Sequence, residues 1–264
     1  MVIADFDYTL TPFFKPTGDR ADSSHGVLST SSVMGPEATA KAHALFEHYY
    51  PIEQSTALTP TEKLPFLLEW WNKEHDILVE YKLTREILKS AVAASDVSFR
   101  EGCMDIFALL EREKVPMLIF SAGLYDVIHA VLDKEFARSL QRTPPANVHV
   151  VSNMMKFDES GTLAGFDGTL IHSLNKNASA IEGTAFSKQC HLEQRHNILL
   201  LGDSLGDANM ADGLKFEEDE IVRIGFLNTD VDNKLEAYLD RFDVVLTDDS
   251  SLLPLELLLQ QIKP

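Results

Sequence analysis

Short apolar runs recur along the chain, and most are separated by segments whose apolar residues have helical spacing. The runs show no strict alternation with polar residues and lie at residues 2–4, 116–120, 148–151, 198–201, 222–226 and 243–246. The helical segments lie at residues 101–113, 124–138, 178–190 and 232–240. Runs of this kind are typical of strands buried on both faces. Strands that alternate with helices predict an α/β fold, in which right-handed crossovers build a doubly wound parallel sheet.

The stretch from residue 36 to residue 94 breaks this alternation, because it carries helix signals and no strand pattern. Its Thr59-Pro60-Thr61-Glu62 has the form of a capping box with proline at the first helical position. We therefore predict a helical insertion after the first strand, reached through the Pro/Gly/Ser-rich segment 12–35. A second excursion, at residues 154–171, is predicted to be a β-hairpin because Glu159-Ser160-Gly161 marks a turn near its centre.

Charge and cysteine content limit the partners and the compartment. The chain has 264 residues, and 41 Asp and Glu against 23 Lys and Arg give a formal net charge of −18. This charge repels polymeric nucleic acid and anionic membranes, so neither is an expected partner. Two cysteines cannot form a disulfide framework, and neither a signal peptide nor a long apolar run is visible. We expect a soluble cytoplasmic protein; no protein partner is inferred, and the oligomeric state stays open.

Acidic residues follow two of the predicted strands. Asp5 and Asp7 end the first strand, and Asp203 and Asp207 follow the strand at residues 198–201. Residues two apart in a strand share a face, so we expect Asp5 and Asp7 to lie together. Close carboxylates at the carboxyl edge of one sheet suit a hard divalent cation such as Mg²⁺. A solvated acidic turn explains the first motif equally well when that motif is taken alone.

Two further segments carry groups that bind phosphate. Ser121, Ala122 and Gly123 lie where a strand meets a helix, and exposed backbone N–H groups there bind phosphate oxygens. An ordinary helix N-cap is the alternative for Ser121. Lys176 precedes a helix at the same edge of the sheet and would supply a cation, although a lone lysine is usually solvated surface. The four segments together predict a phosphoryl-transfer site.

The ordered set Asp-x-Asp-x-Thr, Ser, Lys and Gly-Asp-x-x-x-Asp resembles the haloacid dehalogenase-like (HAD) superfamily of phosphatases. The chain is also similar to the cytosolic pyrimidine 5′-nucleotidase (5′-nucleotidase III) family over nearly its whole length, at residues 5–10, 49–53, 69–71, 120–123, 170–176 and 200–207. The resemblance implies a Rossmann-like HAD core, residues 1–14 and 97–264, with a helical cap, residues 15–96. It also implies Mg²⁺-dependent hydrolysis of nucleoside 5′-monophosphates, mainly pyrimidine ones. Some members transfer phosphate to a nucleoside or accept methylated guanosine monophosphate.

The resemblance assigns roles to the acidic residues. Asp5 is expected to be the nucleophile that forms an aspartyl-phosphate, and Asp7 the general acid and then the general base. Asp5, the backbone carbonyl of Asp7 and Asp203 would hold Mg²⁺, with Asp207 bound directly or through water. In the family this first motif follows an N-terminal helical segment, whereas four residues precede Asp5 here. We therefore expect a truncated chain or a misassigned start codon.

The remaining roles concern the substrate. The phosphate oxygens are expected to bind Ser121, the Ala122 and Gly123 amides, and Lys176. Glu53 matches the family's base-recognising glutamate; its carboxylate can accept from the amine of cytosine but faces a carbonyl in uracil, which predicts CMP over UMP. Trp71 is preferred to Trp70 as a surface for the base. Glu74 departs from the family, which has a substrate-contacting serine there, so the base specificity is open.

Two other readings stay open at this stage. One is a capped HAD phosphatase for another small phosphomonoester, such as a phosphoserine-like compound or a sugar phosphate. The match at Glu53 and Trp71 argues against it. The other is a non-catalytic protein that keeps the scaffold and binds a phosphorylated ligand. The presence of Asp5, Asp7, Lys176 and Asp203 argues against lost catalysis.

Overall fold

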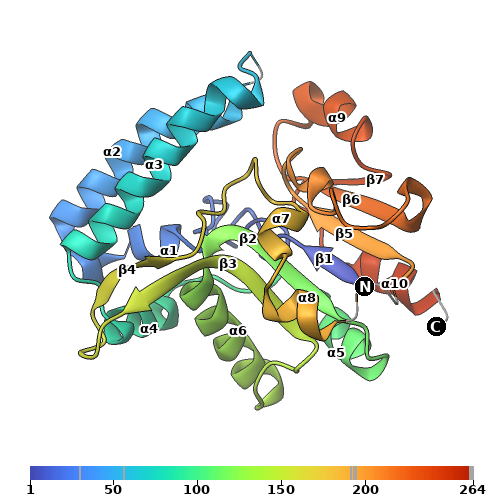
Figure 1. The fold of residues 1–264 in the computed structure, drawn as a ribbon, viewed down its shortest axis with the longest axis horizontal. Helices are drawn as coiled ribbons and strands as arrows, with labels where there is room; N and C mark the ends of the chain where they lie inside the picture. Colours follow the sequence, from blue (N-terminus) through green and yellow to red (C-terminus); the bar gives the residue numbers. More distant parts are fainter. Residues whose placement is uncertain (30, 56, 191, 193–194, 262–264) are drawn as a thin grey trace.

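A single mostly parallel sheet organises the computed structural model, which describes residues 1–29, 31–55, 57–190, 192 and 195–261. Seven strands are found in these residues, in the order β4-β3-β2-β1-β5-β6-β7 (Figure 1). They are β1 (Val2–Ala4), β2 (Met117–Leu124), β3 (Val148–Phe157), β4 (Leu163–Asp167), β5 (Ile198–Gly202), β6 (Ile221–Leu227) and β7 (Val244–Thr247). All neighbouring pairs are parallel except β3 and β4. The order runs outward from β1 in both directions, which confirms the doubly wound α/β fold.

The central strand β1 is short and entirely buried. Ala4 pairs with Ile119 on one side and with Leu201 on the other. Val2 and Ala4 belong to the apolar core on one face of the sheet, while Ile3 between them belongs to the core on the opposite face. Two-sided burial explains why this run is apolar without alternation. The point where the chain order reverses around β1 is where open α/β sheets bind ligands.

Helices cover both faces of the sheet. One face packs against α5 (Cys103–Arg112), α6 (Tyr125–Leu140) and α10 (Leu253–Gln261), which contribute to the same core as Ala4. The opposite face packs against α7 (Ala178–Ile181), α8 (Ala185–Gln189) and α9 (Val231–Leu239). Short 3-10 turns η3 (Asp207–Asn209) and η4 (Glu218–Glu220) complete this half. The molecule is therefore a three-layer α/β structure.

The helical insertion lies where the sequence predicts it, between β1 and α5. It contains α1 (Gly26–Ser29), η1 (Ser32–Met34), α2 (Pro36–Gln54), α3 (Pro60–Glu80) and α4 (Arg85–Ala94). The long helices α2 and α3 run side by side (Figure 1), and the predicted capping box starts α3. There the Thr59 side chain accepts from the Glu62 N–H, and the Glu62 carboxylate accepts from the Thr59 N–H. The division into a core of 1–14 and 97–264 and a cap of 15–96 stays a prediction.

Two local predictions differ in outcome. The predicted hairpin is confirmed, because β3 and β4 pair antiparallel around a turn at residues 158–162. The predicted single helix at 178–190 is wrong, because it is split into α7 and α8. Gly183 between them has a positive φ of 79°, and Thr184 caps α8 through a bond from the Ser187 N–H. A left-handed glycine followed by a new N-cap ends one helix and begins another. Among the described residues no helix has the length and apolar character to cross a membrane.

Candidate active site

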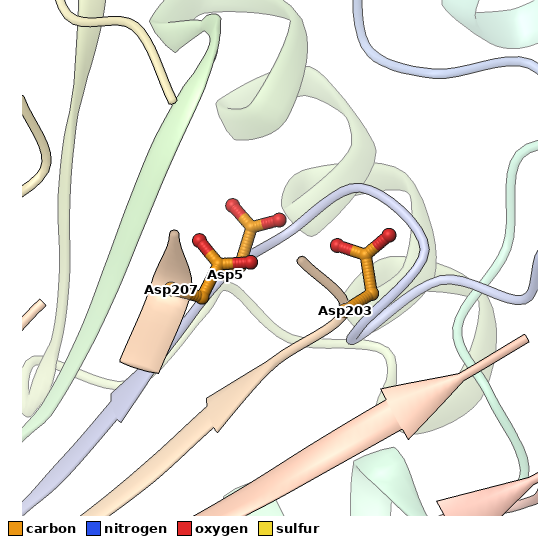
Figure 2. Close-up of side chains that lie close together, drawn as sticks. All are labelled: Asp5, Asp203 and Asp207. Atoms are coloured by element: carbon orange, nitrogen blue, oxygen red, sulfur yellow. The ribbon is translucent and has the colours of Figure 1, made fainter. Parts of the chain in front are cut away.

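Three carboxylates meet at the carboxyl edge of the sheet, beside the end of β1. Asp5 directly follows β1, Asp203 directly follows β5, and Asp207 begins η3 (Figure 2). One carboxylate oxygen from each lies within 4.8 Å of the others. The neighbouring strands fix this convergence, since the Asp5 N–H donates to the Leu201 carbonyl at 2.9 Å. The predicted meeting of acidic residues from two separate strands is present in the structure.

A buried lysine lies against this cluster. The Lys176 ammonium donates to Asp5 Oδ1 at 2.7 Å and to Asp207 Oδ1 at 2.6 Å. Its side chain is 3% exposed, so the alternative of a solvated surface lysine is wrong. Burial favours the neutral amine, but the Asp207 and Asp5 carboxylates outweigh it and raise the pKa of Lys176. The site therefore holds a fixed positive charge inside a strongly acidic protein.

The cluster still has an excess of negative charge. Burial raises the pKa of Asp5 to about 7; Lys176 opposes this shift, and the nearby Asp207 charge adds to it. Burial, with the Asp5 and Asp207 charges, also raises the pKa of Asp203 well above its ordinary value. Two buried carboxylates and the half-buried Asp203, against one ammonium, form an oxygen-rich donor set. A hard divalent cation such as Mg²⁺ fits that set.

Asp7 lies outside the three-carboxylate cluster. The expectation that Asp5 and Asp7 share a strand face is wrong, because β1 ends at Ala4 and the chain turns immediately afterwards. The Asp7 charge is nevertheless close enough to contribute to the raised pKa of Asp5. The Leu10 N–H donates to the Phe6 carbonyl in this turn. The Asp7 carboxylate instead accepts two hydrogen bonds from Ser24, from the N–H and from the hydroxyl, each at 2.6 Å. A role for the Asp7 carbonyl as a metal ligand stays a prediction.

A buried arginine holds the turn that contains Asp7, and sequence reasoning missed it. Arg100 donates from Nε to the Thr9 carbonyl at 2.9 Å and from Nη2 to the Tyr8 carbonyl at 2.7 Å. Its Nη1 pairs with Asp249 at 2.5 Å. Asn228 adds a second bond to the Tyr8 carbonyl, at 2.9 Å. Tyr8 has a φ of 62°, so this network holds a left-handed residue that an isolated turn would disfavour. No motif surrounds Arg100, and its partners are distant in sequence.

The segment Ser121 to Gly123 lies near the end of β2, and Leu124 alone separates it from the start of α6. The Ser121 hydroxyl accepts from the Gly123 N–H at 3.0 Å. The carbonyls of Ala122 and Gly123 accept from the side chains of Asn153 and Ser152. Leu124 is the N-cap of α6, and no side chain caps that helix, so the N-cap alternative for Ser121 is wrong. The backbone here is held firmly and remains a candidate phosphate cradle.

Glu53 contacts the loop that follows β4. It is at the end of α2, and its Oε1 accepts from the Ser173 hydroxyl at 3.2 Å. Ser173 belongs to the loop that also carries Lys176. Burial raises the pKa of Glu53, although Ser173 and the charge of Lys63 oppose this shift. A helix of the insertion thus reaches the loop that supplies the buried lysine.

The two adjacent tryptophans of α3 have different surroundings. Trp70 packs with Tyr49 and Leu67 between the long helices and donates from Nε1 to Glu74 at 3.2 Å. Trp71 lies with its ring centre 4.3 Å from that of His25, and its buried Nε1 has no hydrogen-bond partner among the described residues. Glu74 itself is buried, and burial raises its pKa to about 7. A free buried donor at Trp71 is compatible with its selection as the base-contacting residue.

Comparison with known proteins gives a family match. The family model for pyrimidine 5′-nucleotidase (UMPH-1) matches residues 8–263. A human 7-methylguanosine phosphate-specific 5′-nucleotidase is 41% identical over 261 residues, which cover 99% of this chain and 84% of the relative. The chicken protein of the same name is 43% identical over 251 residues, covering 95% and 83%.

Solved structures show the same relationship. A crystal structure of cytosolic 5′-nucleotidase IIIB bound to cytidine superimposes with a TM-score of 0.83 at 31% identity, covering 98% of this chain and 84% of that one. A phospho-aspartyl intermediate analogue of phosphoserine phosphatase gives a TM-score of 0.52 at 17% identity, covering 99% and 98%. The second likeness supports the HAD fold alone.

Proposed function

We propose that this chain, a 5′-nucleotidase that belongs to the pyrimidine 5′-nucleotidase (UMPH-1) family, hydrolyses the pyrimidine nucleotides CMP and UMP in the presence of Mg²⁺. The observation that carries the proposal is the cluster of Asp5, Asp203 and Asp207 against the buried Lys176, at the switch point of a doubly wound sheet. The products are the nucleoside and inorganic phosphate. Its relatives act on small nucleotides, and two are named cytosolic, which supports a cytoplasmic location.

The donor set defines the proposed metal site. Asp5, Asp203 and the Asp7 carbonyl would hold Mg²⁺, and Asp207 would bind it directly or through water. When bound, the ion neutralises negative charge on the carboxylates and on the phosphoryl group. Lys176 would share that task, because it already binds two of the three carboxylates.

The chain's own residues then perform the two chemical steps. A carboxylate oxygen of Asp5 attacks phosphorus, the bond from phosphorus to the ribose O5′ breaks, and Asp7 gives its proton to that oxygen. Water next attacks the aspartyl-phosphate, Asp7 takes the proton, and phosphate leaves with Asp5 restored. The phosphate oxygens would be held by Ser121, by the Ala122 and Gly123 amides, and by Lys176.

The insertion is proposed to act as a cap that selects the base. Glu53 reaches the loop of Lys176 through Ser173, which supports a place near the substrate. Its carboxylate would accept from the cytosine amine, so CMP would be preferred to UMP. A structural relative is bound to cytidine, which supports a pyrimidine nucleoside as the ligand.

A second candidate substrate is 7-methylguanosine monophosphate. Relatives about two-fifths identical carry that nucleotide in their names. The half-buried Trp71 ring would suit a flat, positively charged base stacked on its face. CMP stays the first candidate because it is the one for which Glu53 supplies a matching acceptor.

Release of inorganic phosphate from a panel of monophosphates tests the proposal. The panel holds CMP, UMP, 7-methylguanosine monophosphate, phosphoserine and a sugar phosphate, each with Mg²⁺ and then with EDTA. We expect release from nucleotides that EDTA abolishes. Faster release from phosphoserine or the sugar phosphate would identify a different phosphatase. Thermal stabilisation by CMP without phosphate release would identify a non-catalytic binding protein.

A further inference from the structure

Ser24 is buried between the first turn of the core and the helical insertion. It belongs to the linker that precedes α1, and it is fully buried. Its N–H donates to Asp7 Oδ1 at 2.6 Å, and its hydroxyl donates to Asp7 Oδ2 at 2.6 Å. One residue therefore contacts both oxygens of a single carboxylate. Two simultaneous bonds fix the plane of that carboxylate far better than one would.

The same hydroxyl lies against the candidate phosphate cradle. A Cβ added at Gly123 would be 1.9 Å from Ser24 Oγ, 3.0 Å from Asp7 Oδ2 and 3.1 Å from Ser121 Oγ. A side chain at Gly123 would therefore displace Ser24. The glycine lets Ser24 bring the Asp7 carboxylate up to the segment expected to hold the phosphate.

Local structure does not account for the Ser24 hydroxyl. The neighbouring Ser23 performs the turn function here, because its hydroxyl accepts from the Gly26 N–H at 3.0 Å and its carbonyl from the Val27 N–H. Val27 and Leu28 are buried and anchor α1 in the core. The position of Ser24 is thus set by the linker of the insertion, while its hydrogen bonds go to the turn after β1.

We propose that Ser24 is a positioning residue, which holds the Asp7 carboxylate in the orientation needed to protonate the leaving O5′. The inference rests on the proposed function, in which Asp7 is the general acid. Through these two bonds from Ser24, the segment that leads into the insertion determines the orientation of the Asp7 carboxylate. A displacement of the linker would therefore turn Asp7 away from the leaving oxygen without moving Asp5.

The test compares two substrates that differ in one atom. CMP needs a proton on its leaving oxygen, whereas the analogue with sulfur at the 5′ bridging position expels a stable thiolate and needs none. In Ser24→Ala, we expect kcat/KM for CMP to fall about 10- to 100-fold, because a positioned general acid contributes roughly 10²- to 10⁴-fold and the Ser24 N–H remains. For the sulfur analogue we expect a fall of less than about 3-fold, since the acid does not act on it.

Three further variants serve as controls for the Ser24→Ala result. Ser23→Ala removes the hydroxyl that accepts from the Gly26 N–H but leaves the Ser24 hydroxyl in place, so any loss should be equal for the two substrates. Ser24→Cys keeps a donor at this position, although the thiol is bulkier and donates more weakly. Its kcat/KM for CMP should lie between those of wild type and Ser24→Ala, and it also carries the test if the alanine variant does not fold. Asp7→Asn should show the same selective loss on CMP, in a stronger form.

The outcomes separate the two claims. Equal losses on CMP and the sulfur analogue in Ser24→Ala, or no loss on either, would overturn the role of Ser24. If Asp7→Asn shows no selectivity between the substrates, the assignment of the general acid fails instead. If the wild-type chain releases no phosphate from any nucleotide, the proposed function fails. If the panel selects a nucleotide other than CMP, the test uses that nucleotide and its analogue with sulfur at the 5′ bridging position.

Discussion

Glu74 makes the stability of this protein depend on pH in a way that can be measured. Its side chain is 9% exposed, and burial raises its pKa from the usual 4.5 to about 7, against the opposing bond from Trp70 Nε1. The native state therefore binds a proton more tightly than the unfolded state, so the free energy of unfolding falls as pH rises from about 4.5 to 7. Below about pH 4.5 the Glu74 carboxyl is neutral in both states and does not affect stability. Above about pH 7 it is charged in both states, and the full cost of burying the charge lowers the free energy of unfolding.

Glu74→Gln removes this cost while keeping an oxygen that can accept from Trp70. The pKa of Glu74 rises from 4.5 in the unfolded state to about 7 in the native state. At roughly 1.4 kcal/mol per pKa unit, the charged carboxylate lowers the free energy of unfolding by about 3 kcal/mol. The variant should therefore be more stable than wild type by about 3 kcal/mol at pH 8 and by about 1 kcal/mol at pH 5.

Urea unfolding followed by far-ultraviolet circular dichroism, with linear extrapolation at both pH values, measures the two differences. Glu80→Gln is the matched control on the same helix, because the Glu80 side chain is 59% exposed and its ion pair with Lys41 lies at the surface. It should change stability by less than about 1 kcal/mol at either pH. A gain for Glu74→Gln that is the same at pH 5 and pH 8 would refute the argument.

Three other substitutions have definite expected outcomes. Asp5→Asn should abolish phosphate release while leaving the thermal midpoint within a few degrees of wild type, and retained activity would discard Asp5 as the nucleophile. Glu53→Ala should lower kcat/KM for CMP more than for UMP, whereas equal losses would contradict base recognition by Glu53. Lys176→Met should destabilise the metal-free protein by about 3–5 kcal/mol in urea unfolding, because two buried carboxylates lose their cation. Added Mg²⁺ should recover part of that loss, and a loss unaffected by Mg²⁺ would argue against a metal at this site.

The parts of the fold that were predicted correctly have short-range signals. Two-sided burial makes β1 and β5 continuous apolar runs, and the capping box at Thr59 marks the start of α3 within four residues. The split helix at 178–190 was missed because a glycine inside a helical pattern can either be tolerated or end the helix. Its outcome depends on the backbone at Gly183, which the pattern does not report.

The residues of the candidate site divide in the same way. Asp203 and Lys176 were found because motif spacing and strand ends point to one edge of the sheet. Arg100 and Ser24 were not found, because their partners are separated from them in sequence and their neighbours form no motif. Arg100 meets Asp249 at a separation of 149 positions, and Ser24 comes from a linker whose composition indicates only a flexible connection. Contacts of this kind exist only after folding has joined the segments.

The central position of β1 also sets when the protein can become active. Lys176 meets Asp5 across 171 positions, and Asp203 meets Thr9 across 194. During synthesis Asp5 emerges long before β5, although β5 is the strand that aligns it with its partner carboxylates. A nascent chain stalled before β5 would carry Asp5 on an unpaired strand edge with no chemistry available to it. Activity can therefore begin only after β5 has been synthesised.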